Sequence, residues 1–298
     1  MSKELNHKRL FVLLSILFMS GLILLSLNKK EIKRPELATP FTFISGPELQ
    51  AQAYIVKIIG GEKPLFSRRE WKRLAPASLT KVLTAVLAKE ALPADEKIIF
   101  STEAKKTEEK LSPAKAGDIF LRDEVIKLAI VGSFNDAAMA LGEAVGKSRR
   151  GANFEERLTI FKVLANEKSH LLKLQNSELQ NPTGLDEENH YSTAEDLARL
   201  AEYVWLRHPD LWAVSRQAET IARAENGTEY KINNTNELLK EFPAILGGKT
   251  GFTDNAKGAL LFLYPVRPDK TAIVVILGSE DRFGDGRKII QWLEENFK

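Results

Sequence analysis

Residues 76–81 read PASLTK and open a stretch in which apolar residues recur at helical spacing. The spacing i, i+3, i+4, i+7 and i+8 predicts a helix with one apolar face turned toward a core. That face consists of Leu79, Val82, Leu83, Val86 and Leu87. Ser78 and Lys81 lie three residues apart, so they share one side of the helix at its start. The stretch therefore predicts a core helix whose first turn carries a hydroxyl beside an amine.

The Ser78–Lys81 pair has the chemistry of a nucleophile and its base. A serine hydroxyl is barely ionised at neutral pH, so a neighbouring group has to take its proton. Lysine has an ordinary pKa of about 10.4 and can serve only if burial or a nearby cation lowers that pKa. The pattern alone is unspecific, because SPAK at residues 112–115 matches it too and an ordinary helix cap is the alternative role for Ser78.

Two further short motifs follow at long intervals along the chain. SFN at residues 133–135 comes just after a predicted helix and offers a hydroxyl and an amide, unless it only caps the next helix. KTG at residues 249–251 lies on a predicted strand, where glycine permits close approach of the backbone to a ligand. A phosphate-binding loop is disfavoured there, because that motif requires a glycine where this chain has Pro243.

The order of the predicted elements indicates an α+β domain. Strand patterns occur at both ends and helical patterns lie between them, so the terminal segments are expected to share one sheet. Gly60-Gly61 is expected to turn the first two strands into a hairpin. The predicted strands are 51–59, 64–67, 260–264 and 272–277, with a turn at 267–269 between the last two. The helices predicted after the first one are 121–131, 136–145, 154–173, 193–207 and 287–297.

The composition of the 298 residues argues against several classes of function. A net charge of +3, from 43 basic and 40 acidic residues, is too balanced to predict a nucleic-acid partner. Without cysteine the chain forms neither disulfides nor thiolate sites. The four histidines are His7, His170, His190 and His208. They show no i, i+4 pairing, so neither a metal site nor a cofactor is predicted.

The N-terminal part is expected to attach the chain to a membrane. Residues 10–27 read LFVLLSILFMSGLILLSL, and as a helix this uncharged stretch nearly spans the hydrocarbon layer. No small-x-small cleavage site follows, so an uncleaved anchor is favoured over a removed signal peptide. Basic residues flank both sides, so the charge distribution leaves the orientation open. The predicted organisation is a cytoplasmic segment 1–9, a transmembrane helix 10–27, a linker 28–45 and one domain 46–298.

Six longer strings resemble those of one family. They are PASLTK (76–81), SFNDAA (133–138), NPTGLD (181–186), HYSTAEDLA (190–198), NNTNELL (233–239) and GGKTGFT (247–253). In this order they look like the D-alanyl-D-alanine carboxypeptidases, low-molecular-mass penicillin-binding proteins of the β-lactamase/transpeptidase-like superfamily. The resemblance covers nearly all of residues 51–298. It implies a transpeptidase-like fold, with an antiparallel sheet, flanking helices and a helical subdomain.

The resemblance also implies an activity and its catalytic residues. Ser78 attacks the D-Ala-D-Ala carbonyl of peptidoglycan pentapeptides and becomes acylated, with Lys81 as base. Ser133 and Asn135 complete the proton relay and orient the peptide. Water then releases the acyl group, whereas β-lactams stay bound as covalent inhibitors. A membrane-tethered enzyme of this kind is expected at the bacterial cell membrane, with its catalytic domain outside the cytoplasm.

The substrate-binding residues are carried over in the same way. They are Lys249, Thr250, Gly251 and Phe252. Lys249 and Thr250 are expected to bind the terminal carboxylate. The backbone N–H groups of Ser78 and Phe252 are expected to form the oxyanion hole. Lys249 is also expected to lower the pKa of Lys81 by like-charge repulsion.

Some features keep other functions open. Phe134 stands where the family commonly has a small residue, which is expected to narrow the cleft, and Lys257 is expected to cause a local bulge. A D,D-endopeptidase would use the same chemistry on a larger substrate. A serine β-lactamase is disfavoured, because no E-x-x-L-N string is present and Glu187 and Glu188 are expected to be solvated loop charges. A non-catalytic muropeptide or β-lactam receptor is the alternative from another class.

Overall fold

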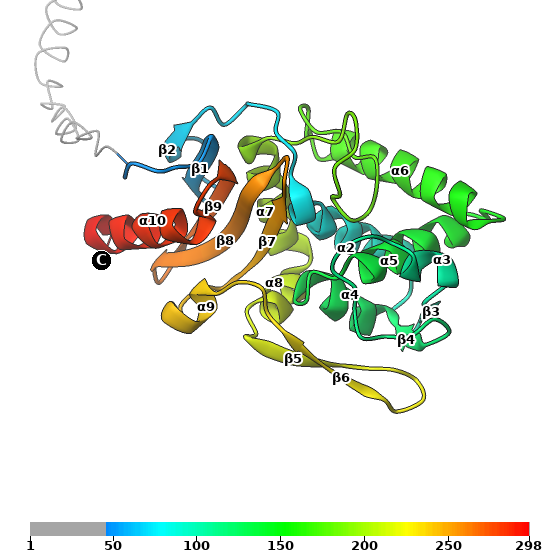
Figure 1. Cartoon of the computed structure of the whole chain (residues 1–298). Coiled ribbons are helices and arrows are strands. Elements are labelled where there is room, and N and C mark those ends of the chain that lie inside the picture. Colours follow the sequence, from blue (N-terminus) through cyan, green and yellow to red (C-terminus); the bar gives the residue numbers. More distant parts are fainter. Residues whose placement is uncertain (1–45, 298) are drawn as a thin grey trace, which may run out of the picture. The chain divides into compact units, whose positions relative to one another are not determined.

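The computed structural model describes residues 46–297, which form the predicted α+β domain (Figure 1). The segment 1–9, the predicted transmembrane helix 10–27 and the linker 28–45 lie outside the described residues. Across residues 46–297, no helix combines the length and the apolar character needed to cross a bilayer.

One antiparallel sheet in the order β2-β1-β9-β8-β7 forms the centre of the domain. Its strands are β1 (Ala53–Ile58), β2 (Pro64–Arg68), β7 (Gly247–Thr253), β8 (Lys257–Arg267) and β9 (Lys270–Ser279). The N-terminal strand β1 pairs with the C-terminal strand β9 along its whole length, with Tyr54 opposite Ile276. The prediction that both ends of the domain share one sheet is therefore confirmed.

The sheet is buried on both faces because side chains alternate along its inner strands. On β8 and β9, Leu261 and Val275 pack into the core formed with the helices, whereas Phe262 and Val274 face the opposite side. α10 (Arg282–Phe297) covers that second face (Figure 1). Full burial of such a side chain contributes about 1.5–3 kcal/mol, so the two apolar faces supply much of the stability.

The helices pack mainly on the other face, and the predicted ones are present. They are α2 (Thr80–Ala91), α4 (Arg122–Ile130), α5 (Asn135–Ser148), α6 (Phe154–Leu171) and α7 (Ala194–Arg207). A short 3-10 helix, η1 (Ala77–Leu79), precedes α2 and contains Ser78. α2 contacts α4, α5, α6 and α7, which makes it the central helix of the domain.

α10 begins at Arg282, five residues before the predicted start at 287. Its first turn lacks the apolar periodicity because it contains Asp285, a buried carboxylate that is held by hydrogen bonds. The Asp285 carboxylate accepts hydrogen bonds from the Ser279 hydroxyl at 2.7 Å and from the Gln50 backbone N–H at 2.9 Å. Because a buried carboxylate interrupts the apolar spacing, the hydrophobic pattern does not predict this turn as part of the helix.

Several short elements were not predicted from the sequence. They are α3 (Thr102–Lys105), α8 (Pro209–Ser215), α9 (Leu238–Glu241), and the hairpins β3 (Lys97–Ile99) with β4 (Ile119–Leu121) and β5 (Glu219–Arg223) with β6 (Glu229–Asn233). The β5–β6 hairpin extends away from the sheet below α8 (Figure 1). Its strands carry charges at alternate exposed positions and little apolar pattern, so they do not resemble core strands.

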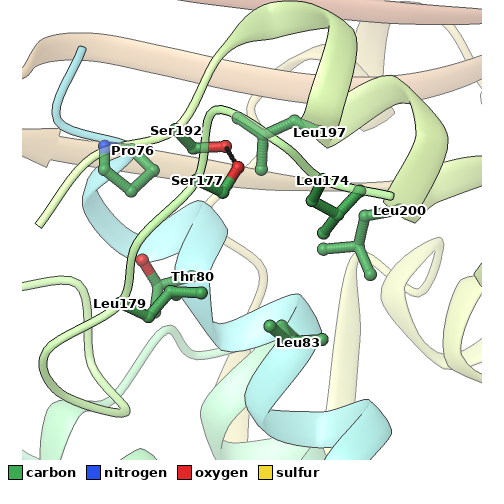
Figure 2. A pocket seen from close by; sticks show the side chains of 9 residues that line it. All are labelled: Pro76, Thr80, Leu83, Leu174, Ser177, Leu179, Ser192, Leu197 and Leu200. Atoms are coloured by element: carbon green, nitrogen blue, oxygen red, sulfur yellow. Dashed lines mark hydrogen bonds between the residues drawn. The ribbon is translucent and has the colours of Figure 1, made fainter. Parts of the chain in front are cut away.

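A small apolar cavity lies between α2 and the segments that precede and begin α7 (Figure 2). Thr80 and Leu83 of α2 line it on one side, and on the other Ser177 and Ser192 join their hydroxyls at 2.8 Å. Its volume of about 10 Å³ is near the smallest space that holds one water molecule. The cavity is a packing feature beneath α2, because neither Ser78 nor Lys81 lines it.

Candidate active site

The three motifs meet at the N-terminal end of α2. The Lys81 ammonium group donates hydrogen bonds to Ser78 Oγ, Asn135 Oδ1 and the Thr183 carbonyl oxygen, each at 2.7 Å. Lys81 is completely buried. Because three acceptors match the three donors of an amine head group, its position beside the Ser78 hydroxyl is fixed.

A second amine lies on the other side of the SFN motif. Lys249 Nζ donates to Ser133 Oγ and to the Thr250 carbonyl, both at 2.7 Å. Thr250 Oγ1 lies 2.5 Å from Thr235 Oγ1. Ser133 therefore contacts the amine from β7, whereas its neighbour Asn135 contacts the amine from α2.

Gly251 lets strand β7 approach the turn that carries Ser78. A Cβ atom added to Gly251 would lie 2.9 Å from Ala77 Cβ and 3.0 Å from the Ser78 backbone nitrogen. The sequence predicted a close approach to a ligand, and the structure shows a close approach to η1. Phe252 follows on the strand with its side chain 56% exposed, next to the Arg282 guanidinium.

The structural alternatives for the motif serines do not hold. In the described part of the chain, neither η1, α2 nor α5 has a side-chain hydrogen bond at its N-cap, so Ser78, Ser133 and Asn135 are not helix caps. The rival S-x-x-K at residues 112–115 is not a second site. Its Ser112 binds the Asp136 carboxylate, and its Lys115 is exposed.

Backbone strain coincides with both serine-bearing turns. Ala77, just before Ser78, has φ +48°, and Ser133 has φ +60°. Non-glycine residues rarely adopt this left-handed region, and each such residue costs about 1–3 kcal/mol. The surrounding packing holds both turns in these conformations, which fixes where their hydroxyls point.

Burial is the largest cause and the ammonium of Lys110 the second, and together they lower the pKa of Lys81 to about 7 against weaker opposing effects of nearby carboxylates. Burial also lowers the pKa of Lys249 well below its ordinary value, followed by repulsion from Lys81, Lys110 and Arg282. The sequence-based expectation named Lys249 as the cause for Lys81. In the structure, burial is the largest cause of the lowered Lys81 pKa and Lys110 is the second, whereas Lys249 is not among the causes. A lysine with a pKa of about 7 is partly neutral at neutral pH and can accept a proton from Ser78.

The loop that follows Asn181 supplies a site residue that the motifs did not reveal. Asn181 Oδ1 accepts hydrogen bonds from the Thr183 N–H at 3.1 Å and the Gly184 N–H at 2.8 Å, which tightens the loop into a turn. The turn directs the Thr183 carbonyl at Lys81. The string NPTGLD marked this loop, but a backbone carbonyl has no side-chain signature.

Gly184 is expected to be indispensable for this turn. It has φ +85°, and an added Cβ would lie 1.9 Å from the Ala77 carbonyl oxygen. We expect Gly184→Ala to lower the free energy of unfolding by about 3 kcal/mol or more and to weaken covalent penicillin labelling. Gly227 has the same φ of +85° with no atom within 4 Å, so Gly227→Ala is the matched control and should lose only about 1 kcal/mol. Equal losses in thermal unfolding would contradict the proposed clash.

Three polar side chains of the same loop are not assigned to catalysis. His190 is buried, its pKa is lowered to about 4 chiefly by burial, and its Nε2 lies 3.1 Å from Thr80 Oγ1. It is therefore neutral at physiological pH. Glu187 and Glu188 are exposed, as predicted, so neither is buried beside Ser78 as a base for water.

Arg282 is a second residue that the motifs missed. It is the first residue of α10, and its side chain lies over the Phe252 and Phe283 rings. Burial lowers its pKa, and its Nε is buried without a hydrogen-bond partner among the described residues. Such an unsatisfied guanidinium nitrogen close to Lys249 is a ready donor for an anion.

The two departures from the family pattern have structural consequences. The Phe134 ring packs over Gly132, where an added Cβ would lie 2.3 Å from the ring, and it is partly buried against the helical core. At least part of its bulk therefore lies inside the domain rather than in the cleft. Lys257 has φ +56°, and the pairing of β8 with β9 shifts register just after it, between Gly258 and Leu260.

A family model described as D-alanyl-D-alanine carboxypeptidase matches residues 41–281. The chain belongs to this carboxypeptidase family. The D-alanyl-D-alanine carboxypeptidase DacF of Bacillus subtilis is 32% identical over 224 residues, which are 73% of this chain and 54% of the relative. The chain thus spans about half the length of that family member. The D-alanyl-D-alanine endopeptidase of Pseudomonas aeruginosa is 29% identical over 256 residues, 83% of this chain and 78% of the relative.

A solved structure shares the fold of this carboxypeptidase-family chain. The DD-transpeptidase of Streptomyces K15 superposes with a TM-score of 0.77 at 23% identity, covering 84% of this chain and 99% of that one. At this identity the likeness concerns the fold alone. The predicted transpeptidase-like α+β architecture is therefore confirmed.

Proposed function

We propose that this protein is a serine-type D-Ala-D-Ala carboxypeptidase that removes the terminal D-alanine of peptidoglycan pentapeptides. One observation carries the proposal: the buried Lys81 amine, with a pKa of about 7, lies 2.7 Å from Ser78 Oγ. Neutral Lys81 takes the Ser78 proton as the oxygen attacks the penultimate D-Ala carbonyl carbon. The D-alanine leaves with a proton, and water later hydrolyses the Ser78 ester.

The remaining site residues bind and orient the peptide. Lys249, Thr250 and Arg282 are the groups proposed for the terminal carboxylate, since a charge-assisted hydrogen bond is the stronger kind. Asn135 orients the peptide, and Ser133 passes the proton to the leaving amine. The backbone N–H groups of Ser78 and Phe252 are proposed as the oxyanion hole, where a single donor contributes about 3 kcal/mol.

The decisive experiment is mass spectrometry of pentapeptide muropeptides before and after incubation with the purified chain. Loss of one alanine from each pentapeptide supports the carboxypeptidase, and an unchanged spectrum contradicts it. A long-lived penicillin adduct on Ser78 supports the same conclusion, whereas rapid hydrolysis of penicillin would identify a β-lactamase.

A D,D-endopeptidase is the second candidate. It is favoured by one specific observation, the 29% identity over 83% of this chain to a P. aeruginosa protein named as an endopeptidase. The same acyl-enzyme chemistry would then cut a cross-link between two stem peptides. Conversion of dimeric muropeptides to monomers in the same mass spectra distinguishes it from removal of alanine.

We expect the rate of Ser78 acylation to rise with pH through a midpoint of about 7, because neutral Lys81 is the base. About a tenth of Lys81 is neutral at pH 6 and about nine-tenths at pH 8, so the rate constant for fluorescent penicillin should rise about tenfold. His190, with a pKa of about 4, stays neutral throughout and does not contribute. A rate that is flat across this range, while the protein stays folded, would argue against Lys81 as base.

The proposed location is the bacterial cell membrane, with a single anchor at residues 10–27 and the domain 46–298 outside the cytoplasm. The uncharged stretch and a substrate outside the cytoplasm support this arrangement. Protease added to intact protoplasts should cleave the domain while a tag at the N-terminus remains protected. Cleavage of the domain only after lysis would contradict it.

A further inference from the structure

The loop between α3 and β4 carries a lysine at the edge of the site. Its backbone is tied to the SFN motif at two points. The Asn135 N–H donates to the Lys110 carbonyl at 2.9 Å, and Asn135 Nδ2 donates to the Glu108 carbonyl at 3.1 Å. Asn135, whose side chain binds Lys81, therefore also fixes the backbone of this loop beside the site.

Asp136 holds the same loop from its other end. Its completely buried carboxylate accepts the Ser112 N–H at 2.9 Å and the Ser112 hydroxyl at 2.6 Å, and it pairs with Lys105 at 2.5 Å. Between the two anchors, Glu109 has φ +61°. Residues 108–112 are therefore a fixed turn, and the side chain of Lys110 starts from a defined backbone position.

The charge of Lys110 is not compensated within the domain. Across residues 46–297, no hydrogen bond or ion pair joins its ammonium to any group, although Glu108 and Glu109 are its neighbours in sequence. Lys110 as a residue is exposed, yet partial desolvation and the nearby Arg282 guanidinium lower its pKa. Its field also lowers the pKa of Lys81 and Lys249. The carboxylates of Glu109 and Asp136 oppose the shift at Lys81, but neither forms an ion pair with Lys110, so its ammonium is available to pair with a ligand carboxylate.

Lys110 is a further cation beside the groups proposed for the terminal carboxylate. The proposed function already assigns the terminal carboxylate to Lys249, Thr250 and Arg282. Terminal D-alanine has no side-chain carboxylate. A further negative charge has to come from a residue earlier in the peptide.

We propose that Lys110 is a specificity-determining residue that binds a second carboxylate, carried by a peptide residue upstream of the two terminal D-alanines. The inference rests on the proposed function, since it concerns the peptide that this site hydrolyses. Lys110 distinguishes peptides that differ only in whether the upstream acid is free or converted to a carboxamide. The enzyme therefore prefers substrates in which this acid is not amidated.

The test uses two synthetic pentapeptides ending in D-Ala-D-Ala, one with a free upstream carboxylate and one with the carboxamide. With the full chain, we expect kcat/KM about tenfold higher for the carboxylate peptide, because a charge-assisted hydrogen bond is lost with the amide. Loss of the Lys110 charge also raises the pKa of Lys81 equally for both peptides, so the ratio of the two kcat/KM values is the readout, and Lys110→Met should bring that ratio close to one. Lys106→Met, which removes an exposed charge from the same loop, is the matched control and should keep the preference.

Two results would overturn the inference. Equal losses for both peptides in Lys110→Met would mean that Lys110 serves the terminal carboxylate or Lys81. No change for either peptide would mean that Lys110 binds nothing in the substrate.

A binding measurement separates this inference from the proposed function. If the chain releases no D-alanine from either peptide, the proposed function fails. The ratio of the two peptide Kd values, measured in Ser78→Ala with and without Lys110→Met, still tests Lys110. A preference that depends on Lys110 in that background supports the inference, and a ratio of one overturns it.

Discussion

Replacing Ser78 by Ala is expected to abolish both release of D-alanine and covalent labelling by fluorescent penicillin. The Ser78 hydroxyl accepts a 2.7 Å hydrogen bond from Lys81 and is the proposed point of acylation. Removing a covalent nucleophile lowers kcat by about 10⁴-fold or more. The fold should persist, because the hydroxyl caps no helix in the described part of the chain. Circular dichroism and thermal unfolding check the fold, and mass spectrometry of the protein checks for the adduct.

Ser112→Ala is the matched control, since Ser112 begins the other S-x-x-K sequence. It should keep covalent labelling and lose about 1.5–3 kcal/mol of stability, because its hydroxyl binds the buried Asp136 carboxylate. Residual D-alanine release by Ser78→Ala above the rate of contaminating enzymes would refute Ser78 as the nucleophile. Loss of labelling in a folded Ser112→Ala variant would mean that Ser112, rather than Ser78, is the nucleophile.

The side chains of the site could be predicted from the sequence because each lies in a short string with a fixed spacing. Ser78 and Lys81 share a helix turn, so their contact follows from helix geometry alone. The distance between Lys81 and Asn135 does not follow, since 54 residues separate them and only the folded core brings them to 2.7 Å. The resemblance to a family supplied that step.

The site groups that the sequence did not reveal act through a backbone carbonyl or through their charge. The Thr183 carbonyl contacts Lys81, but any residue type offers a carbonyl. Arg282 and Lys110 act by charge from loops and a helix start outside the motifs. The cause of the lowered Lys81 pKa was missed for the same reason, because the extent of burial is set by the packing of distant elements.

The fold could be predicted where apolar periodicity is strong. Strands β8 and β9 and helix α2 carry continuous apolar patterns, and each was found close to its predicted position. The β5–β6 hairpin has charges on its exposed faces, and the first turn of α10 contains a buried Asp285. At both places polar contacts rather than apolar burial determine the structure, so hydrophobic patterns give no signal.

Replacing Lys81 by Met is expected to lower the rate of Ser78 acylation by about 10²–10⁴-fold, the usual contribution of a general base. Methionine fills a similar volume in this fully buried position but cannot take a proton. The rise of the residual rate through pH 7 should disappear. Lys89→Met, on the same helix and paired with Asp210 at the surface, is the control and should acylate normally.

The same variant tests the lowered pKa of Lys81 without any measurement of activity. The folded pKa is about 7, whereas the unfolded chain has the ordinary value of about 10.4, so between these values the unfolded state binds more protons. The free energy of unfolding of the wild type should therefore rise with pH across this window, by up to about 1.4 kcal/mol per pH unit from this group. Below pH 7 the destabilisation by charged, buried Lys81 should be fully present. The pKa of Lys249 is lowered chiefly by burial, which Lys81→Met leaves in place, so most of its slope is common to both proteins and the difference between them comes mainly from Lys81. Parallel stability curves in urea from pH 6 to pH 9 would mean that Lys81 keeps an ordinary pKa, and a permanently charged amine could not activate Ser78.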